Sequence, residues 1–509
     1  MIRSFASVSG FTLLSRISGF ARDVTLASIL GSGLMADAYF VAQRLPNHFR
    51  AIFGEGAFNS AFVPAYTREL ESHGEAAARD LASAILTGLT VILLILTALA
   101  MWQMDVVIDL LAPGFSDEPE KYALAITLTR ITFPYLLLIS VVTLISGTLN
   151  AHQKFASAAA APVLLNLAII AALALSFLFP SAAHAAAWGI AISGVLQLAL
   201  VAINAKRTNC LPRFTWPRSS PATKKFLKAL GPAVIGSAGV QIAIFADTII
   251  ASLLPTGAVS AISYADRLYQ LPVGLIGIAA GTVLLPEMSR HLGRDDPSKA
   301  HAAQNHTMAL TLLLTMPFFI AFLMIPEEII RGVFMHGRFT AADATASALV
   351  LAAYGIGILP VVLIRSLVAS FHARQDTMTP LIAAFIGIAV NVILKLALYH
   401  SWGASGLAFA TAIGAWINGG LLALLAYRKS WLAPDQKLFR LIIAMGLAGL
   451  ALALATPHLK IIAMMITASL PLTAVFTLLT LALAGGAVYA LVVFVTARLL
   501  SVPLPLRMR

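Results

Sequence analysis

The sequence predicts an all-α polytopic membrane protein with about 14 transmembrane helices, built as two six-helix lobes related by a parallel repeat around a central cationic cavity, plus two C-terminal helices. Three observations support this fold class. The chain is 59% hydrophobic and only 11% charged, with a mean hydropathy of +0.89, which lies far outside the range of soluble domains. Its apolar runs recur at the length that crosses a bilayer. Lys and Arg fall mainly between alternate runs, as the positive-inside rule expects.

Fourteen segments contain the roughly 20 mainly apolar residues that a spanning helix needs. In order, the predicted spans are 8–30, 36–65, 81–103, 122–149, 159–180, 184–204, 226–253, 258–288, 304–325, 344–370, 380–400, 404–427, 438–456 and 468–498. Charged residues lower the hydropathy of the first, second and eighth spans. A count of twelve or thirteen is therefore the main alternative.

The charges of the loops predict the orientation of these spans. Fourteen spans place both termini on one side of the membrane, and with the termini in the cytoplasm most Lys and Arg lie in cytoplasmic loops. Only four of the Lys and Arg residues lie in the predicted outer loops: Lys121, Arg331, Arg338 and Lys460. Because cytoplasmic loops carry the excess of basic residues, we expect both termini to be cytoplasmic.

The two halves of the chain resemble each other. ADAYFVAQRLPN at 36–47 is similar to SAISYADRLYQLP at 260–272, and each is followed by a second similar run that contains a proline, Pro64 in the first half and Pro286 in the second. A basic loop with several prolines, 204–228, separates the halves. An even number of spans per repeat gives both lobes the same orientation. The predicted N-terminal lobe, C-terminal lobe and pair of C-terminal helices are 1–215, 216–430 and 431–509.

Charged residues lie deep within the first, second and eighth spans. Arg16 and Arg22 are close to the middle of the first span, beyond easy reach of either interface. A charge at the centre of a bilayer helix costs about 2.5–3.5 kcal/mol on an insertion scale, so these side chains must face protein or water. The charged residues of the three spans include Arg16, Arg22, Asp23, Asp37, Arg44, Arg50, Glu55, Asp266 and Arg267. Several of the acids lie near span ends, so the sequence predicts a cavity with a positive excess.

Arginine predominates over lysine among these cations. Its planar guanidinium donates two parallel hydrogen bonds to a carboxylate or phosphate and keeps its charge when desolvated. The pattern therefore favours a phosphate-bearing ligand, bound by four arginines: Arg16, Arg22, Arg50 and Arg267. The alternative is that the arginines only pair with Asp and Glu and thereby fix the register of the helices.

Two further charges are deep in the membrane, Asp247 in the seventh span and Lys395 in the eleventh. They could form a buried ion pair. Alternatively, Asp247 could coordinate a small cation together with Asn391 and Thr411. An ammonium group close to such a site disfavours a bound cation, so the ion pair is the preferred interpretation.

The sequence supports neither an enzyme nor a cofactor or metal site. Cys210 is the single cysteine, and Cys and His do not cluster with metal-ligand spacing. No phosphate loop, nucleophile elbow or soluble domain large enough for an ATPase is visible. The net charge of +12 is distributed between apolar runs, so nucleic acid is not an expected partner.

Five motifs, in order along nearly the whole chain, match a known family. They are SRISGFARDVTLASILGSGLMADAYFVAQRLPNHFRAIFGEGAFNSAFVPAY at 15–66, APGF at 112–115, ITFPYLLLIS at 131–140, YADRL at 264–268 and LLPEMS at 284–289. With these motifs the chain closely resembles the MurJ (MviN) family, the lipid II flippases of bacterial peptidoglycan synthesis. The likeness is most specific through the first two helices, and in the last two spans it rests on hydropathy alone.

The resemblance implies the fold of the multidrug/oligosaccharidyl-lipid/polysaccharide exporter superfamily, with two lobes in a V and two C-terminal helices that form a lipid-side groove. The family's functional positions correspond to Arg16, Arg22, Asp23, Asp37, Arg50, Glu55 and Arg267, and Ser15 lies in the same motif. The resemblance implies that the arginines bind the pyrophosphate, while Asp23, Asp37 and Glu55, with Ser15, pair charge and gate the cavity. Lys395 departs from the family's cation-site pattern, so ion coupling is not transferred.

The resemblance further implies a flippase of the bacterial inner membrane that moves lipid II, the undecaprenyl-pyrophosphate-linked disaccharide-pentapeptide, from the cytoplasmic to the periplasmic leaflet by alternating access. Lipid II, membrane lipids and cell-wall synthesis and division proteins are the expected partners. A flippase for another polyprenyl-linked oligosaccharide would share the pyrophosphate. A multidrug exporter of the same superfamily is disfavoured by the arginines. A membrane partner in cell-wall assemblies, without transport, would tolerate the loss of Arg16 or Arg267.

Overall fold

The computed structural model describes residues 2–50, 57–216 and 220–505, and over these residues the protein is helical without strands. Side chains are described except at 2–7, 48–50, 57, 233, 235–243 and 278. The chain divides into two compact units, Met1–Ser260 and Ala261–Arg509. This division follows packing, whereas the predicted domains 1–215, 216–430 and 431–509 follow the sequence repeat and stay a prediction.

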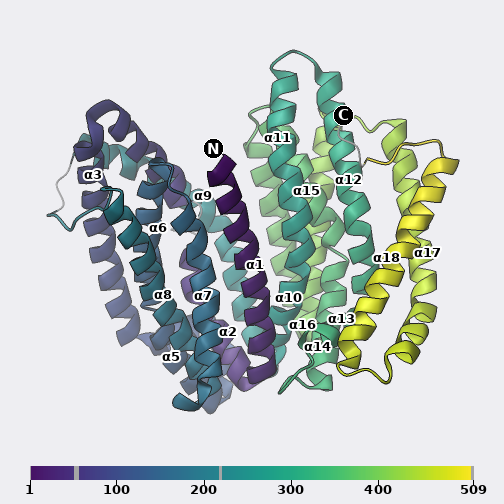
Figure 1. Ribbon diagram of the computed structural model, residues 1–509, viewed down its shortest axis with the longest axis horizontal. Helices are drawn as coiled ribbons and strands as arrows, with labels where there is room; N and C mark the ends of the chain where they lie inside the picture. Colours follow the sequence, from purple (N-terminus) through teal and green to yellow (C-terminus); the bar gives the residue numbers. More distant parts are fainter. Residues whose placement is uncertain (1, 51–56, 217–219, 506–509) are drawn as a thin grey trace. The chain divides into compact units, whose positions relative to one another are not determined.

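The first unit is a bundle of helices. Its elements are α1 (Ile2–Leu30), α2 (Leu34–Arg50), α3 (Ala57–Trp102), α4 (Met104–Leu111), η2 (Pro113–Asp117), α5 (Pro119–Thr132), α6 (Tyr135–Ala151), α7 (Ala156–Ala174), η3 (Ser176–Leu178), α8 (Ala182–Arg207) and α9 (Pro221–Ser252). In Figure 1, α7 lies beside α1 and α8, and α3 packs on α6 and α9. The apolar faces of α2 to α6 meet in a core that includes Leu45, Leu93 and Leu136.

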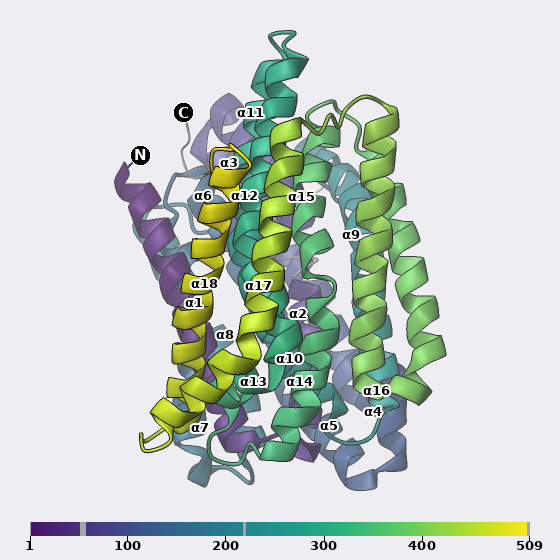
Figure 2. The same cartoon turned by 90° about the vertical axis from the view of Figure 1, so that its right-hand side faces the viewer.

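The second unit continues from α10, which begins at the end of the first unit. Its elements are α10 (Ala258–Pro272), the π-helical turn η4 (Val273–Gly277), α11 (Ile278–Leu292), α12 (Pro297–Met324), α13 (Pro326–Phe334), α14 (Ala341–Gly355), α15 (Ile358–His372), α16 (Met378–Arg428), α17 (Gln436–Thr467) and α18 (Thr473–Leu499). Figure 2 shows α17 and α18 side by side, with α12 behind them. A core around Leu312, Leu441 and Tyr489 joins these three helices.

Two of the helices are too long to be single spans. α3 has 46 residues and α16 has 51, about 70 and 75 Å at 1.5 Å per residue, against a hydrocarbon core of about 30 Å. Each is broken at a glycine with positive φ, 81° at Gly74 and 53° at Gly403, which a residue without a side chain adopts readily. Asp376, just before α16, pairs with Lys429, just after it, at 2.8 Å. The two arms of α16 are therefore antiparallel, at the positions of the predicted spans 380–400 and 404–427.

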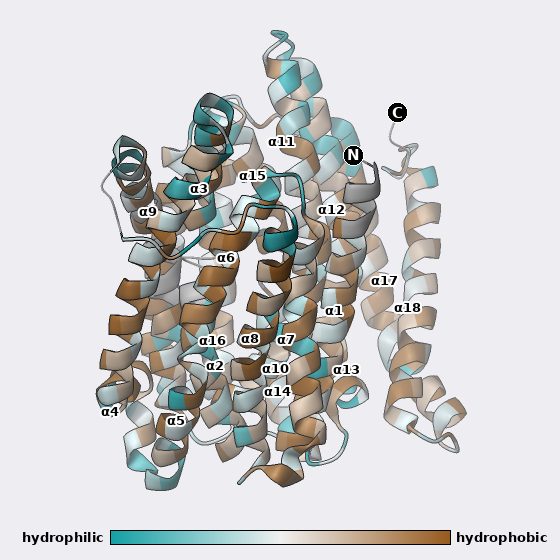
Figure 3. Ribbon diagram, turned by 60° about the vertical axis from the view of Figure 1, so that its left-hand side comes forward, coloured by the Kyte–Doolittle hydropathy of each residue, from teal (hydrophilic) through white to brown (hydrophobic). Residues whose placement is uncertain are grey.

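Ten helices within the described ranges are long and apolar enough to cross a membrane, so the chain is a multi-pass membrane protein; the count of fourteen stays a prediction. Figure 3 shows hydrophobic residues along the middle of helices such as α7 and α8, and hydrophilic residues where α11 approaches its turn into α12. α1 and α2, as far as they are described, are not among the ten; both contain charged residues, and 17 residues of α2 are described.

The predicted span 36–65 includes parts of α2 and α3, and its residues 51–56 lie outside the described residues. One predicted span needs correction. The span 438–456 is too short, because α17 continues through Pro457 to Thr467. A proline removes one backbone hydrogen bond, which a membrane helix tolerates when neighbouring groups compensate.

Candidate functional site

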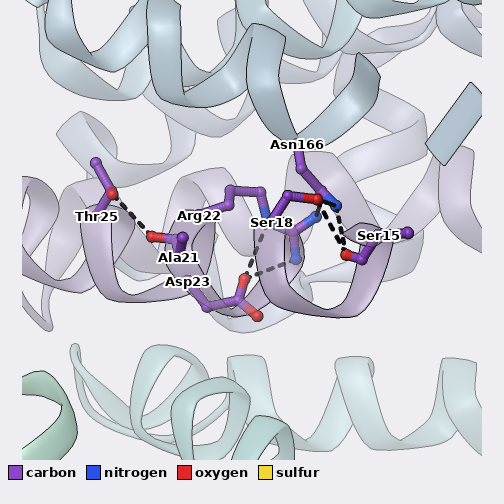
Figure 4. Close-up of polar contacts among 7 residues, drawn as sticks. All are labelled: Ser15, Ser18, Ala21, Arg22, Asp23, Thr25 and Asn166. Atoms are coloured by element: carbon purple, nitrogen blue, oxygen red, sulfur yellow. Dashed lines mark hydrogen bonds and ion pairs between the residues drawn. The ribbon is translucent and has the colours of Figure 1, made fainter. Parts of the chain in front are cut away.

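A buried arginine lies in the second half of α1 and is held by protein acceptors. Arg22 donates from Nε and Nη2 to Oδ1 of Asp23, at 3.0 and 2.6 Å, and from Nη1 to Oδ1 of Asn166 on α7, at 2.9 Å. Figure 4 shows the three side chains together. Arg22 and Asp23 are 7% and 8% exposed and Asn166 is 4% exposed. Because acceptors on the protein replace water, the guanidinium can stay charged away from solvent.

Asn166 is a functional candidate that the sequence analysis missed. Its Nδ2 donates to the carbonyl oxygen of Ser15 and to Oγ of Ser18, both at 3.0 Å, while its Oδ1 accepts from Arg22. A Cβ at Gly19 would lie 3.4 Å from this amide, so the glycine lets the side chain lie close against α1. The one signal in the sequence is an amide in the otherwise apolar run APVLLNLAII.

Arg16 contrasts with Arg22 on the same helix. Its side chain is exposed, and it makes no hydrogen bond or ion pair with the described residues. α1 extends from Ile2 to Leu30, so Arg16 is at the middle of the helix. One arginine of α1 is thus bound by protein acceptors, and the other has donors that a ligand can use.

Asp37 binds the start of α10 rather than an arginine. Its Oδ2 accepts from the backbone N–H of Gly257 at 2.7 Å, and its Oδ1 from that of Ser260 at 2.8 Å. The first N–H groups of a helix have no partner within the helix, and this fully buried carboxylate provides one. Ser32 adds a hydrogen bond to Oγ of Ser260 at 2.8 Å. Arg44, two turns after Asp37, donates instead to Oγ1 of Thr248 at 3.0 Å.

A second buried cation holds the connector between α9 and α10. Lys121 is 1% exposed, and its Nζ donates to Oε1 of Glu118 at 3.1 Å and to Oγ1 of Thr256 at 2.8 Å. The same Nζ lies 4.4 Å from the centroid of the Phe115 ring. Hydrogen bonds from Thr256 and then Lys121 lower the pKa of the Glu118 carboxyl. The sequence analysis had placed Lys121 only in an outer loop.

The remaining predicted ligands of the phosphate are placed less completely. Arg267 is on α10 and is half-buried. Arg50 is the last residue of α2, but its side chain and all of Glu55 lie outside the described residues. Ser15 contributes its carbonyl oxygen to Asn166. The convergence of Arg16, Arg22, Arg50 and Arg267 on one ligand therefore stays a prediction.

The predicted ion-pair or cation residues of α16 lie where its two arms cross. Lys395 is 1% exposed, and one turn earlier Oδ1 of Asn391 is buried without a partner among the described residues. A Cβ at Gly414 would lie 2.8 Å from Cβ of Asn391, so the arms are in close contact there. Thr411 donates its hydroxyl to the carbonyl oxygen of Leu407 at 3.0 Å. Asp247 belongs to the other unit, and its pairing with Lys395 stays a prediction.

The fold matches those of solved membrane transporters. A solved structure described as "Inward-facing conformation of a multidrug resistance MATE family transporter of the MOP superfamily" matches with a TM-score of 0.68 and 15% identity, over 83% of this chain and 97% of the other. A solved "Lipid II flippase MurJ, inward closed conformation" matches with a TM-score of 0.82 and 27% identity, over 97% of this chain and 99% of that one.

Within that class, the chain belongs to the lipid II flippase MurJ family. The family model, described as "Lipid II flippase MurJ", matches residues 26–483. A probable lipid II flippase MurJ of Rhizobium meliloti (strain 1021) is 40% identical over 504 residues, which cover 97% of this chain and 94% of that protein. A lipid II flippase MurJ of Burkholderia cenocepacia is 35% identical over 463 residues, 89% of each.

Proposed function

We propose that this protein is a lipid II flippase of the bacterial inner membrane, which moves undecaprenyl-pyrophosphate-linked disaccharide-pentapeptide from the cytoplasmic to the periplasmic leaflet by alternating access. Membership of the lipid II flippase MurJ family supports lipid II as the substrate. The observation that carries the chemistry is the exposed guanidinium of Arg16 at the middle of α1, close in sequence to the compensated Arg22. Guanidinium donors suit a pyrophosphate, because charge-assisted bidentate hydrogen bonds to phosphate are strong and geometrically specific.

In the proposed cycle, the pyrophosphate is bound first by Arg16, with Arg50 and Arg267 completing the site. Asp23 holds Arg22 in the empty state, and the substrate competes for the donors of Arg22 when it enters. Asp37, Glu55 and Ser15 affect the opening and closing of the cavity. Asp37 does so through its hydrogen bonds to the start of α10. The prenyl tail stays in lipid along α17 and α18. Both termini are cytoplasmic, and cell-wall synthesis and division proteins are neighbours in the membrane.

The test of this function is depletion of the protein in its host, followed by an assay of lipid II accessibility at the outer leaflet. We expect accessibility to fall. Complementation with Arg16→Ala should fail, whereas Arg130→Ala, which removes an exposed arginine of another membrane helix, should support growth. Unchanged accessibility on depletion, or full complementation by Arg16→Ala at normal protein levels, would contradict the proposal.

We also propose that Asp247 and Lys395 form an ion pair that takes the place of a bound cation beside Asn391 and Thr411. The buried position of Lys395 supports this, because an ammonium ion buried without a counter-charge would be costly. Flipping in proteoliposomes should then proceed at the same rate when Na⁺ is replaced by K⁺ or choline. A rate that depends on Na⁺ would favour the cation site instead.

A further inference from the structure

A groove with one polar end lies between α11 and α12 in the second unit, apart from the residues discussed above. Its volume is about 690 Å³. The two helices are neighbours joined by the short turn 293–296, which Figure 2 shows at the top of the view. At the end near this turn the groove is lined by Glu287 of α11 and by His306 and Thr307 of α12. Beyond them the lining is apolar and includes Leu275, Ala280, Val283, Leu310, Leu314 and Phe318.

The polarity of the groove changes along its length as it does along a lipid of one leaflet. Glu287 and His306 lie near the ends of the predicted spans 258–288 and 304–325, which is the level of lipid headgroups. From His306 to Phe318 the groove follows α12 for 12 residues, about 18 Å at 1.5 Å per residue. One leaflet of a hydrocarbon core of about 30 Å is about 15 Å thick. The apolar part therefore has the length of an acyl chain, and the polar end lies where its headgroup would be.

Glu287 gives the polar end of the groove a carboxylate that the protein does not satisfy. Its neighbours Leu284 and Met288 pack into a core with Ala300, whereas Glu287 is half-buried and lines the groove. Among the residues that the structure describes, no side chain or backbone group forms a hydrogen bond or ion pair with it. An ionisable group within a membrane span is costly unless it finds water or a partner. Because a carboxylate offers only acceptors, the partner that suits it is a cation with N–H donors.

The charges around the groove favour a zwitterionic lipid over an anionic one. A polyprenyl pyrophosphate would bring negative charge to Glu287 without a donor for its oxygens. Arg290 follows Glu287 by three residues on α11 and is exposed, and side chains at this spacing are neighbours on a helix surface. The guanidinium can therefore bind a phosphate while Glu287 binds an ammonium group of the same headgroup.

We propose that the groove between α11 and α12 binds a phospholipid with a primary ammonium group, as phosphatidylethanolamine has. The ammonium donates to the carboxylate of Glu287, the phosphate accepts from Arg290, and one acyl chain lies along the groove as far as Phe318. Phosphatidylcholine has no N–H donors for the carboxylate. Phosphatidylglycerol has hydroxyl donors but no positive charge, so neither lipid satisfies Glu287 as phosphatidylethanolamine does.

The experiment uses the purified full chain in detergent with short-chain phosphatidylethanolamine, phosphatidylcholine or phosphatidylglycerol, and measures the retained lipid by native mass spectrometry. We expect phosphatidylethanolamine to be retained about tenfold more tightly than the other two. Glu287→Gln removes the negative charge and should weaken its retention about tenfold, as loss of a charged hydrogen bond would. Glu71→Gln, at an exposed glutamate of the other unit, is the matched control and should change nothing. Ala280→Leu narrows the apolar part and should lower the retention of all three lipids.

Equal retention of the three lipids would overturn the proposal, and so would unchanged retention of phosphatidylethanolamine by Glu287→Gln. Undecaprenyl phosphate is added as a competitor: if it displaces phosphatidylethanolamine from the wild type, the groove holds a prenyl chain and the proposal is wrong. A dimer that carries no lipid would assign the groove to a second copy of the chain instead. If Ala280→Leu does not fold, the comparison of the three lipids on the wild type and the effect of Glu287→Gln still decide the outcome.

Discussion

Arg22 can keep its charge in the buried part of α1 because its acceptors come from two directions. Asp23 follows it on α1 and supplies the counter-charge, while Asn166 reaches it from α7. Removing one partner of a buried charge pair typically destabilises a protein by about 3–5 kcal/mol, since the remaining charge is left uncompensated. Three N–H groups of the guanidinium donate to these acceptors. The other two can donate to the substrate before it competes for the three that Asp23 and Asn166 hold.

Asn166 should act as a positioning residue for Arg22. In Asn166→Ala the side chain of Arg22 loses one acceptor and α1 loses two hydrogen bonds to α7, each of which contributes about 1 kcal/mol. We expect the rate of lipid II flipping in proteoliposomes to fall about tenfold. Asn204→Ala, on a half-buried asparagine of α8, is the matched control. Equal rates in the two variants, at equal reconstitution, would show that the amide does not position the arginine.

A residue of the candidate site can be predicted when its neighbours in the sequence already make it unusual. It cannot be predicted when its role depends on a partner that is distant in the chain. Charges in an apolar run are conspicuous, so Arg16, Arg22 and Asp23 could be proposed as candidates from the sequence. Asn166 could not, because a neutral amide is tolerated in many membrane helices and its role arises only where α7 meets α1. Asp37 was identified, but its partner was not. Its bonds to Gly257 and Ser260 depend on a contact between segments that are far apart in the chain.

The break in α16 should depend on the absence of a side chain at Gly403. Its φ of 53° and ψ of −137° are strained for any residue with a Cβ, at about 1–3 kcal/mol. We expect Gly403→Ala to lower the free energy of unfolding by that amount in denaturant titrations. Gly420→Ala is the matched control, since neither glycine has a heavy atom within 4 Å of an added Cβ and only Gly403 has a positive φ. Gly420→Ala should be neutral or stabilise by up to about 1 kcal/mol.

The ion pair between Asp376 and Lys429, which joins the two ends of α16, should stop contributing to stability at low pH. The hydrogen bond from Lys429, followed by that from the backbone N–H of Thr379, lowers the pKa of Asp376 from its ordinary 3.8 to about 2. A lowered pKa in the folded state means that the stabilisation is fully present above pH 3.8 and disappears as the pH falls through about 2. Lys429 is 41% exposed, so the contribution is about 1 kcal/mol or less.

The measurement is thermal unfolding of the wild type and Asp376→Asn between pH 5 and pH 2. The wild type should be the more stable at pH 5, and the difference should vanish near pH 2. Asp117→Asn, at an exposed carboxylate of η2, should follow the wild type throughout. A difference between Asp376→Asn and the wild type that is constant with pH would show that the ion pair does not contribute.

At the scale of elements, hydropathy located most helices well because a lipid-exposed segment must satisfy its own backbone hydrogen bonds. The predicted span 184–204 lies within α8, and the predicted span 304–325 ends one residue beyond α12. The errors have local causes. The polar residues around Pro457 hid the last three turns of α17. The short helices α4 and α13 were not predicted, since they are too brief for a spanning window.

For the whole molecule, the composition was sufficient to predict a membrane protein, and the resemblance was sufficient to predict its family. The fold and the ligand follow from different physical arguments. The bilayer leaves only helices and closed barrels as spanning structures, so apolar runs of this length determine an all-helical protein. The arginines indicate a phosphate, because their donors fit one. They say nothing about the sugar or the peptide, which make contacts that no pattern in the chain reveals. The identity of the carried lipid therefore comes from the relatives.

Flipping by a cationic cavity should respond to the membrane potential. If the empty cavity returns to the cytoplasmic side with a net positive charge, an inside-negative potential favours that step by about 2.3 kcal/mol per charge per 100 mV. Potassium diffusion potentials across proteoliposomes provide the test, and we expect faster flipping when the compartment facing the cytoplasmic side is negative. Arg16→Gln removes one cavity charge and should weaken the dependence, whereas Arg130→Gln should leave it unchanged. A flipping rate that does not change with the imposed potential would contradict this prediction. It would mean that each arginine stays paired with a carboxylate throughout the cycle, so that no net charge moves across the membrane.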